Sequence, residues 1–277
     1  MLIATWNVNS VRARLELVLE WLESHHPDLL CLQETKVKDC LFPVSAFKHL
    51  GYYVQAYGQS SYNGVAFISK KPLEDIRLGF TSELPKDPEA VFLDRQKRII
   101  SGIFKDIRVV NLYVPNGSDL GSKKYFHKLA WLSCLGRYLV ASRRREEPLC
   151  VLGDFNIALE ARDIYNSERL TGALMASELE RRALHKALDK GLWDMFRVFE
   201  SEPGHWSWWD YRSSAWERNQ GWRIDYIYFC KELMDRTRSC AIDAMQRGRL
   251  RPSDHVPVLV NLDWPIESID GDGTDYD

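Results

Sequence analysis

Short apolar runs that end in small groups of polar residues recur along the chain. Runs of this length predict buried strands. The predicted strands cover residues 2–6, 29–32, 52–57, 65–69, 99–104, 107–114, 149–152, 206–209, 222–229 and 256–262. The pairs Asn63-Gly64 and Lys105-Asp106 predict hairpin connections within the β-rich part of the chain between residues 52 and 114.

Apolar residues at helical spacing predict three helices between the strands. The first follows Ser10, which can cap it, and ends before Pro27. The second covers about residues 123–144 and the third covers residues 177–188. The core-facing positions expected in the second helix are Leu129, Leu132, Leu135, Leu139 and Val140. Residues 161–176 have no clear period and are predicted to form a loop. Strands alternating with helices predict a layered α/β fold, although the pattern leaves the strand order open.

The composition indicates an ordinary globular protein of 277 residues, with 45% hydrophobic and 27% charged residues. No linker or repeat interrupts it, so we expect one domain over residues 1–264, followed by an acidic tail, 265–277, that is disordered. The six cysteines lack CxxC spacing, which favours reduced thiols in a cytoplasmic protein over a disulfide or zinc framework. We expect no targeting segment and no membrane span.

The polar residues at the predicted strand ends carry the candidate chemistry. They are Asn7, Asn9, Glu34, Tyr113, Asn116, Asp154, Asn156, Asp225, Asp254 and His255. Carboxylate and amide oxygens favour a hard cation such as Mg²⁺ or Mn²⁺. A His beside an Asp, with another Asp nearby, can act on a phosphate oxygen. Together these groups suit phosphodiester hydrolysis by an activated water. No P-loop is present, which argues against nucleoside triphosphate chemistry.

Each of these residues also has a structural explanation when it is considered alone. Asp154 and Asn156 can form a turn after Gly153, instead of sharing one side of an extended segment. Glu34 can pair with Lys36, Asp225 can pair with a neighbouring base such as Arg223, and Asp254 can cap a turn. These structural explanations are less convincing for the residues as a group, because carboxylates are rarely buried without a cation or partner.

The sequence closely resembles the exonuclease III family of apurinic/apyrimidinic endonucleases, within the endonuclease/exonuclease/phosphatase superfamily that includes deoxyribonuclease I. The matching motifs are Thr5-Trp6-Asn7-Val8-Asn9-Ser10, Leu32-Gln33-Glu34-Thr35-Lys36, Tyr62-Asn63-Gly64-Val65-Ala66, Asn111-Leu112-Tyr113-Val114-Pro115-Asn116-Gly117, Gly153-Asp154-Phe155-Asn156, Gly221-Trp222-Arg223-Ile224-Asp225 and Ser253-Asp254-His255. The resemblance extends from Met1 to about Trp264. It implies a four-layer α/β sandwich of two packed β-sheets flanked by helices, with the site at one edge of the sheets.

The resemblance also implies a metal site. Glu34 corresponds to the principal Mg²⁺ ligand, with Asn7 and Asp254 beside it. The ion would stabilise the departing 3′ oxygen, and Mn²⁺ is expected to substitute for it. Whether Asp154 and Asn156, or His255, also ligate a metal stays open at this point.

The remaining strand-end residues correspond to the catalytic groups of the family. Asp154 would orient and deprotonate the attacking water, with Asn156 helping to position it. His255, held by Asp225, would contact the scissile phosphate. Two further residues, Tyr113 and Asn116, would bind phosphate oxygens.

The expected partner is double-stranded DNA with abasic sites or damaged 3′ ends, bound by a monomer. Trp208, Trp222 and Ile224 correspond to a pocket for a flipped abasic sugar, although core packing is the alternative for tryptophans in this region. The expected phosphate contacts are Lys36, Arg212, Arg218, Arg247, Arg249 and Arg251. The loop 163–175 lacks the Trp that many bacterial relatives carry near Leu170, which leaves the balance of activities open.

The predicted function is therefore a magnesium-dependent DNA repair phosphodiesterase. It would incise the backbone 5′ to abasic sites, trim 3′ ends as an exonuclease or 3′-phosphatase, or do both. The alternatives are a catalytically silent nucleic-acid-binding regulator on the same fold and a phosphodiesterase of another substrate.

Overall fold

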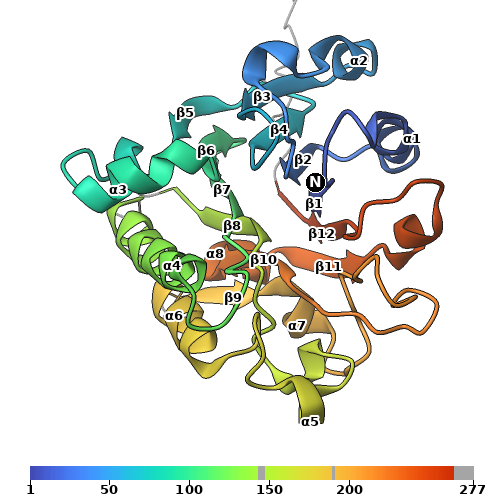
Figure 1. The fold of residues 1–277 in the computed structure, drawn as a ribbon. Coiled ribbons are helices and arrows are strands. Elements are labelled where there is room, and N and C mark those ends of the chain that lie inside the picture. Colours follow the sequence, from blue (N-terminus) through green and yellow to red (C-terminus); the bar gives the residue numbers. More distant parts are fainter. Residues whose placement is uncertain (143–146, 189–190, 265–277) are drawn as a thin grey trace, which may run out of the picture.

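The computed structural model describes residues 1–142, 147–188 and 191–264, which form two six-stranded sheets (Figure 1). The first sheet has the order β11 (Thr237–Ile242), β12 (Val258–Leu262), β1 (Leu2–Asn7), β2 (Leu29–Gln33), β4 (Val65–Ser69), β3 (Tyr53–Tyr57). The second has the order β5 (Glu74–Leu78), β6 (Ile99–Phe104), β7 (Ile107–Tyr113), β8 (Leu149–Asp154), β10 (Asp225–Cys230), β9 (Leu192–Asp194).

Helices cover the outer faces of both sheets. The first sheet is flanked by α1 (Leu15–His25) and α2 (Val44–His49), and the second by α3 (Pro88–Leu93), α4 (Lys123–Ser142) and α6 (Glu178–Leu188) (Figure 1). Shorter helices are α5 (Ser167–Leu170), α7 (Met195–Phe199) and α8 (Lys231–Asp235). Short 3₁₀ helices are η1 (Asp39–Leu41), η2 (Phe80–Ser82), η3 (Asp94–Gln96), η4 (Ala161–Asp163) and η5 (Ala244–Gly248). The predicted four-layer α/β sandwich is confirmed.

Side chains of the central strands alternate between the two faces of each sheet. They contribute to three apolar layers, one between the sheets and one on the outer face of each sheet. In β2, Leu29 and Cys31 belong to the cluster between the two sheets, where Val109 and Leu152 of the second sheet meet them. Leu30 and Leu32, on the opposite face of β2, pack in the cluster that includes Trp21 and Leu22 of α1. Strands buried on both faces are continuous apolar runs, which explains why the sequence marks them so clearly.

Two parallel strand pairs bring distant polar residues to the same edge of the sandwich. The parallel pair β1/β2 is connected through α1, and the parallel pair β7/β8 is connected through α4. Parallel neighbours require such a crossover, and their carboxyl ends coincide. Asn7 is thus level with Gln33 in the first sheet, and Tyr113 is level with Asp154 in the second.

Several predicted boundaries are wrong for identifiable reasons. The first helix starts at Leu15, because Ser10 has a φ of 92° and residues 11–14 form a turn, to which the Ser10 hydroxyl offers a weak cap at Ala13 N. In α4, Val140 is exposed, and the buried stripe includes Lys128 instead. The predicted end of that helix at 144 and the predicted tail 265–277 lie outside the described residues.

The predicted strand 206–209 is also wrong. Trp208 forms only isolated bridges, to Trp222 and to His255. The neighbouring strand begins at Asp225 instead of 222, and the last strand begins at Val258, after Pro257, which has no N–H to donate. The predicted loop 161–176 contains η4 and α5. Lys105-Asp106 does connect β6 and β7 as a hairpin, whereas Asn63-Gly64 ends a longer connection between β3 and β4.

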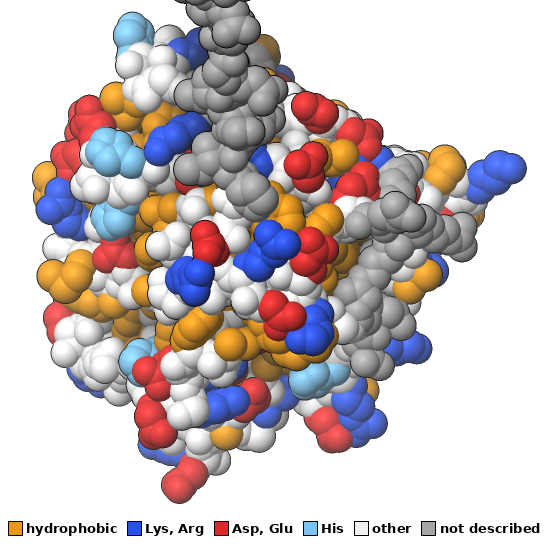
Figure 2. All heavy atoms as spheres, turned by 180° about the vertical axis from the view of Figure 1, so that it is seen from behind, with side chains coloured by type: hydrophobic (Ala, Val, Ile, Leu, Met, Phe, Trp, Pro, Cys, Tyr) orange, Lys and Arg blue, Asp and Glu red, His pale blue; other side chains and the backbone are white. Residues whose placement is uncertain are grey.

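Charge is interspersed on the face turned away from the view of Figure 1. Where that face is visible, basic and acidic side chains lie among each other, with no field of one sign (Figure 2). This agrees with the net charge of −2. Within the part of the chain that the structure describes, no helix combines the length and apolar character needed to cross a bilayer.

Candidate active site

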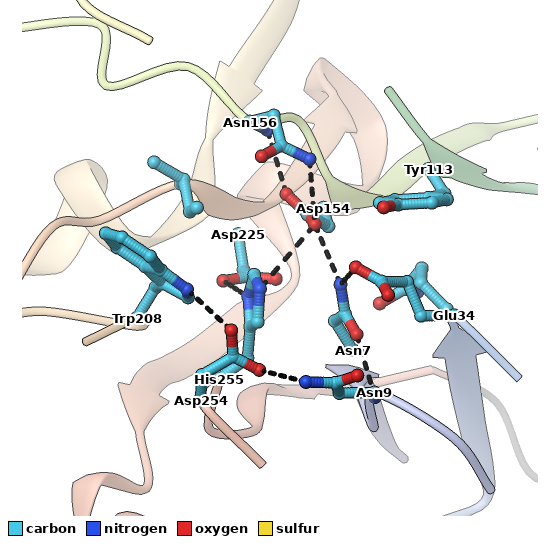
Figure 3. Close-up of polar contacts among 12 residues, drawn as sticks. Asn7, Asn9, Glu34, Tyr113, Asp154, Asn156, Trp208, Asp225, Asp254 and His255 are labelled. Carbon is cyan, nitrogen blue, oxygen red and sulfur yellow. Dashed lines mark hydrogen bonds and ion pairs between the residues drawn. The ribbon is translucent and has the colours of Figure 1, made fainter. Parts of the chain in front are cut away.

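Asp154, the last residue of β8, lies at the centre of a buried polar cluster (Figure 3). Its Oδ1 accepts the backbone N–H of Asn156 at 2.8 Å, and its Oδ2 accepts Nδ2 of Asn7 at 2.9 Å and of Asn156 at 3.1 Å. Burial raises the pKa of Asp154 to about 7, and the charge of His255 counteracts part of that rise. Near neutral pH this carboxylate can therefore accept a proton.

His255 lies between two carboxylates. Its Nδ1 is 2.8 Å from Asp225 Oδ2, and its Nε2 is 3.7 Å from Asp154 Oδ2. Burial alone would lower the pKa of His255, but the charges of Asp225 and then Asp154 outweigh it and raise the pKa to about 10. The ring is thus an imidazolium at neutral pH, held in place because the Ser207 hydroxyl also donates to Asp225 Oδ2 at 2.7 Å.

Glu34 follows β2 and forms the second charged centre of the site. Its Oε1 accepts Nδ2 of Asn7 at 3.0 Å, and its Oε2 is 2.7 Å from Nζ of Lys36. Burial favours the neutral acid, but the charge of Lys36 and hydrogen bonds from Lys36, Asn7 and Tyr113 lower the pKa of Glu34. Glu34 therefore stays ionised, and the expected Glu34–Lys36 ion pair is present.

Asp254 joins this centre through Asn9. Asp254 Oδ1 accepts Nδ2 of Asn9 at 2.9 Å, and its Oδ2 accepts Nε1 of Trp208 at 3.0 Å. Lys36 Nζ lies 2.5 Å from Asn9 Oδ1, so its ammonium joins the groups around Glu34 to those around Asp254. Lys36, a predicted phosphate contact, thus lies inside the cluster. Asn9, a strand-end residue without a predicted role, thus connects Asp254 with Lys36.

The donor set fits a hard cation. Glu34 supplies an ionised carboxylate, Asp254 supplies another carboxyl group, and Asn7 supplies an amide oxygen, which accepts the N–H of Asn9 at 3.0 Å; Mg²⁺ and Mn²⁺ prefer oxygen ligands of this kind. The Lys36 ammonium already binds Glu34 and Asn9 as a cation does. Asp154, Asp225 and His255 also place potential ligand atoms within 4.8 Å of one another, but the protonated ring of His255 would have to lose a proton before it could ligate a metal.

Tyr113 borders Glu34 from the end of β7 and rests on an arginine. Burial and then the charge of Glu34 raise the pKa of Tyr113 well above its usual range, so the phenol keeps its proton. The Arg98 guanidinium lies 4.4 Å from the centre of the Tyr113 ring, and its Nη1 donates to the Tyr113 carbonyl at 3.2 Å. Sequence reasoning missed Arg98, since no pattern distinguishes it from other bases near a strand.

An amide pair links the cluster to a pocket. Asn116 Nδ2 donates to Asn156 Oδ1 at 3.0 Å and lies 3.6 Å from the sulfur of Met175. Met175 lines a pocket of about 390 Å³ together with Tyr165, Leu170, Trp208, Asp210, Arg212, Ser213, Ala215, Gln220 and Trp222.

The residues expected at this pocket take different positions. Trp208 and Trp222 line it, whereas Ile224 is buried in the apolar cluster around Trp222. Arg212 lies at its rim, where the exposed guanidinium pairs with Asp210 at 2.8 Å.

Other expected pairings and phosphate contacts have different partners in the structure. Arg223 does not bind Asp225: its Nε lies 2.8 Å from Asp163 and its Nη1 lies 2.7 Å from Asp194. Arg249 pairs with Glu20 at 2.5 Å, and Arg247 is buried over the ring of Tyr211.

Comparison with known proteins assigns the chain. A model of the endonuclease/exonuclease/phosphatase family matches residues 4–255. The chain belongs to this family. Exodeoxyribonuclease III of Haemophilus influenzae is 33% identical over 270 residues, covering 93% of this chain and 98% of the relative. The resemblance to exonuclease III noted in the motifs, and the prediction of a hydrolase, are confirmed.

Solved structures of family members share the fold. The 3′ phosphatase NExo from Neisseria, bound to a product DNA hairpin, superposes with a TM-score of 0.89 at 36% identity, covering 95% of this chain and 100% of that one. An AP endonuclease from Archaeoglobus fulgidus has a TM-score of 0.86 at 37% identity, covering 95% of this chain and 99% of its own.

Proposed function

We propose that the protein is a magnesium-dependent DNA repair phosphodiesterase that incises the backbone 5′ to abasic sites, trims damaged 3′ ends, or does both. The observation that carries the proposal is the pairing of a buried carboxylate with a buried imidazolium, Asp154 Oδ2 and His255 Nε2, 3.7 Å apart. The carboxylate can take a proton from water while the cation faces developing negative charge. The names of the relatives, an exodeoxyribonuclease III, a 3′ phosphatase and an AP endonuclease, support DNA as the substrate.

In the proposed mechanism, Asp154 accepts the proton of the attacking water. Asn156 uses its N–H groups to hold both oxygens of that carboxylate, and this fixes the direction of attack. His255, kept protonated by Asp225, contacts the scissile phosphate and balances the charge that develops there. The Tyr113 phenol and the Asn116 amide donate to the other phosphate oxygens.

Glu34, Asn7 and Asp254 would hold the magnesium ion, which when bound supplies positive charge for the departing 3′ oxygen. Mn²⁺ is expected to substitute because it accepts the same oxygen ligands. For Lys36 to contact phosphate as well, its ammonium would have to exchange Glu34 for the DNA backbone.

The pocket beside His255 would receive the abasic sugar. Trp208 and Trp222 present apolar walls there, Ile224 packs behind Trp222, and Arg212 lies at the rim in reach of the DNA backbone. An abasic nucleotide loses no base stacking when it leaves the duplex, so its extrusion costs less than that of an intact nucleotide. This difference would select damaged sites.

The test uses a 5′-labelled duplex with one abasic-site analogue, with Mg²⁺ or with excess chelator. Parallel reactions hold an undamaged duplex with a recessed 3′ end and the same duplex ending in a 3′ phosphate. Magnesium-dependent incision at the lesion supports the endonuclease, and loss of the 3′ phosphate or stepwise shortening supports 3′-end processing. If the protein cleaves none of the three substrates, the proposal is refuted, and the silent regulator or a phosphodiesterase of another substrate is favoured.

A further inference from the structure

A buried ion pair lies directly behind the candidate active site. Lys128 of α4 and Glu180 of α6 are both fully buried, and Lys128 Nζ lies 2.5 Å from Glu180 Oε1. Lys128 occupies a position in the apolar stripe of its helix, one turn from Leu132. Isolated charges are costly to bury, so this pair has to be explained by the contacts that it makes.

The Lys128 ammonium binds two loops of the site. Its Nζ donates to the carbonyl of Asn116 at 3.1 Å and to the carbonyl of Asn156 at 2.8 Å, in addition to Glu180. All three donors of the ammonium are thereby used. One buried cation therefore connects the segment that follows β7 with the segment that follows β8.

Glu180 extends the connection to a third loop. Its Oε1 accepts the N–H of Met175 at 3.2 Å, and its Oε2 accepts the N–H and the hydroxyl of Ser177 at 3.1 Å and 2.6 Å. Ser177 and Glu180 form the capping box at the start of α6. Met175 lines the pocket, so the wall of the pocket is anchored to the same pair.

This series of hydrogen bonds ends at Asp154, the proposed base. Asn156, held by its carbonyl, uses its backbone N–H and its Nδ2 to bind both carboxylate oxygens of Asp154. Replacing a buried ion pair with well-packed apolar residues is often neutral or stabilising, but apolar residues could not donate to the two carbonyls. What only the lysine supplies is therefore the hydrogen bonding of the Asn116 and Asn156 loops.

We infer that Lys128 and Glu180 are positioning residues for the proposed hydrolysis. They hold the loops of Asn116, Asn156 and Met175 in one arrangement. This keeps the Asp154 carboxylate, the Asn116 amide and the pocket wall aligned. The inference rests on the proposed function, since it assigns these residues to the same reaction. Neither residue touches the reacting atoms, and they act through Asn156 and Met175.

The test separates positioning from folding with Lys128→Met, Glu180→Gln and the double variant. Lys128→Met leaves the Glu180 carboxylate buried without a cation and should lower the melting temperature markedly. Adding Glu180→Gln removes that charge and should restore most of the melting temperature, while the carbonyls of Asn116 and Asn156 still lack their donor. We expect the double variant to keep a kcat reduced about 10- to 100-fold with KM nearly unchanged.

Glu180→Gln alone keeps the lysine donors and should therefore retain more of kcat than the double variant. The matched control is Lys231→Met with Asp235→Asn, which removes an exposed ion pair on α8 and should leave kcat unchanged. A double variant with the kcat of the original protein would overturn the inference. The inference would also be overturned if kcat in every variant fell only in proportion to the fraction of folded protein.

A second readout does not depend on activity. The side-chain amide NMR signals of Asn116 and Asn156 should shift in Lys128→Met/Glu180→Gln and stay in place in the control. Amide signals that do not move would overturn the inference even if kcat falls. If the original protein cleaves none of the three DNA substrates, the proposed function fails, whereas these amide signals still decide whether the ion pair positions the loops.

Discussion

Asp154 and Asp225 are direct partners in the antiparallel ladder between β8 and β10. Opposite residues of such a ladder project to the same face of the sheet, so two buried carboxylates face one space. His255 fills it, 2.8 Å from Asp225 and 3.7 Å from Asp154. Because the imidazolium of His255 lies between the two carboxylates, the proton equilibria of Asp154 and His255 depend on each other, and the pH dependence of the proposed reaction depends on this strand pairing.

We expect a bell-shaped dependence of the cleavage rate on pH. The rate should rise as pH increases through about 7, where Asp154 loses its proton and becomes a base, and it should fall near pH 10, where His255 loses its charge. Single-turnover incision rates at constant Mg²⁺ measure both limbs. In Asp225→Asn the alkaline limb should move to lower pH, because the main charge that raises the His255 pKa is gone. An unmoved limb in that variant would contradict the role of Asp225, and Asp235→Asn is the exposed control.

Asp154→Asn should lower the single-turnover rate by about 10²- to 10⁴-fold, because the amide cannot accept the proton of the attacking water. DNA binding, measured by fluorescence anisotropy with the abasic duplex, should be largely retained, since the change removes a negative charge close to the phosphate site. Lost binding combined with a normal rate at saturating protein would exclude the role assigned to this carboxylate.

Glu34→Gln should raise the Mg²⁺ concentration required for half-maximal activity by roughly 10- to 100-fold, because an ionised ligand is replaced by a neutral one. A magnesium titration of the incision rate measures the change. Glu16→Gln, on the exposed side of α1, is the control and should leave the titration unchanged. Equal magnesium requirements in Glu34→Gln and the original protein would argue against ligation by Glu34.

DNA affinity should fall steeply with salt, because phosphate contacts release counterions. Arg212→Ala should reduce the slope of log K against log[salt] by about 1 if the guanidinium at the pocket rim contacts a phosphate. The matched control is Arg238→Ala, which also removes an exposed, paired arginine. The assignment of Arg212 fails if both variants keep the slope of the original protein.

Asp163→Asn should destabilise the fold by about 3–5 kcal/mol, because it removes the anion that the buried Arg197 binds and leaves the buried Arg223 with Asp194 alone. Asp163 is fully buried and binds Arg197 at 2.6 Å and Arg223 at 2.8 Å. Urea unfolding measures the loss. Arg182→Ala removes an exposed pair on α6 and should cost under about 1 kcal/mol. Similar losses of unfolding free energy in the two variants would show that the buried cluster stabilises the fold no more than an exposed ion pair does.

The site residues that the sequence revealed are those that stand where a strand ends. Asn7, Glu34 and Asp154 follow continuous apolar runs, and a polar residue at that point is visible without any structure. The residue types alone also show which chemistry is available, namely oxygen ligands for a metal and a carboxylate base. Arg98 and Lys128 could not be recognised in this way. Lys128 did leave a signal, a lysine within an apolar helical stripe, and Glu180 left another, the Ser-x-x-Glu capping box, but neither says what the side chain binds.

The sequence by itself determined the layered α/β class, the main strands and helices, and most of the polar residues of the site, because apolar periodicity records which positions are buried. Only the tertiary structure decided that Asp225 binds His255 and not Arg223, that Trp208 holds Asp254 in place of forming a strand, and that Lys36 lies within the charged cluster. These pairings depend on the register between strands and loops far apart in the chain. A hydrophobic pattern records the environment of each position but not the identity of its partner.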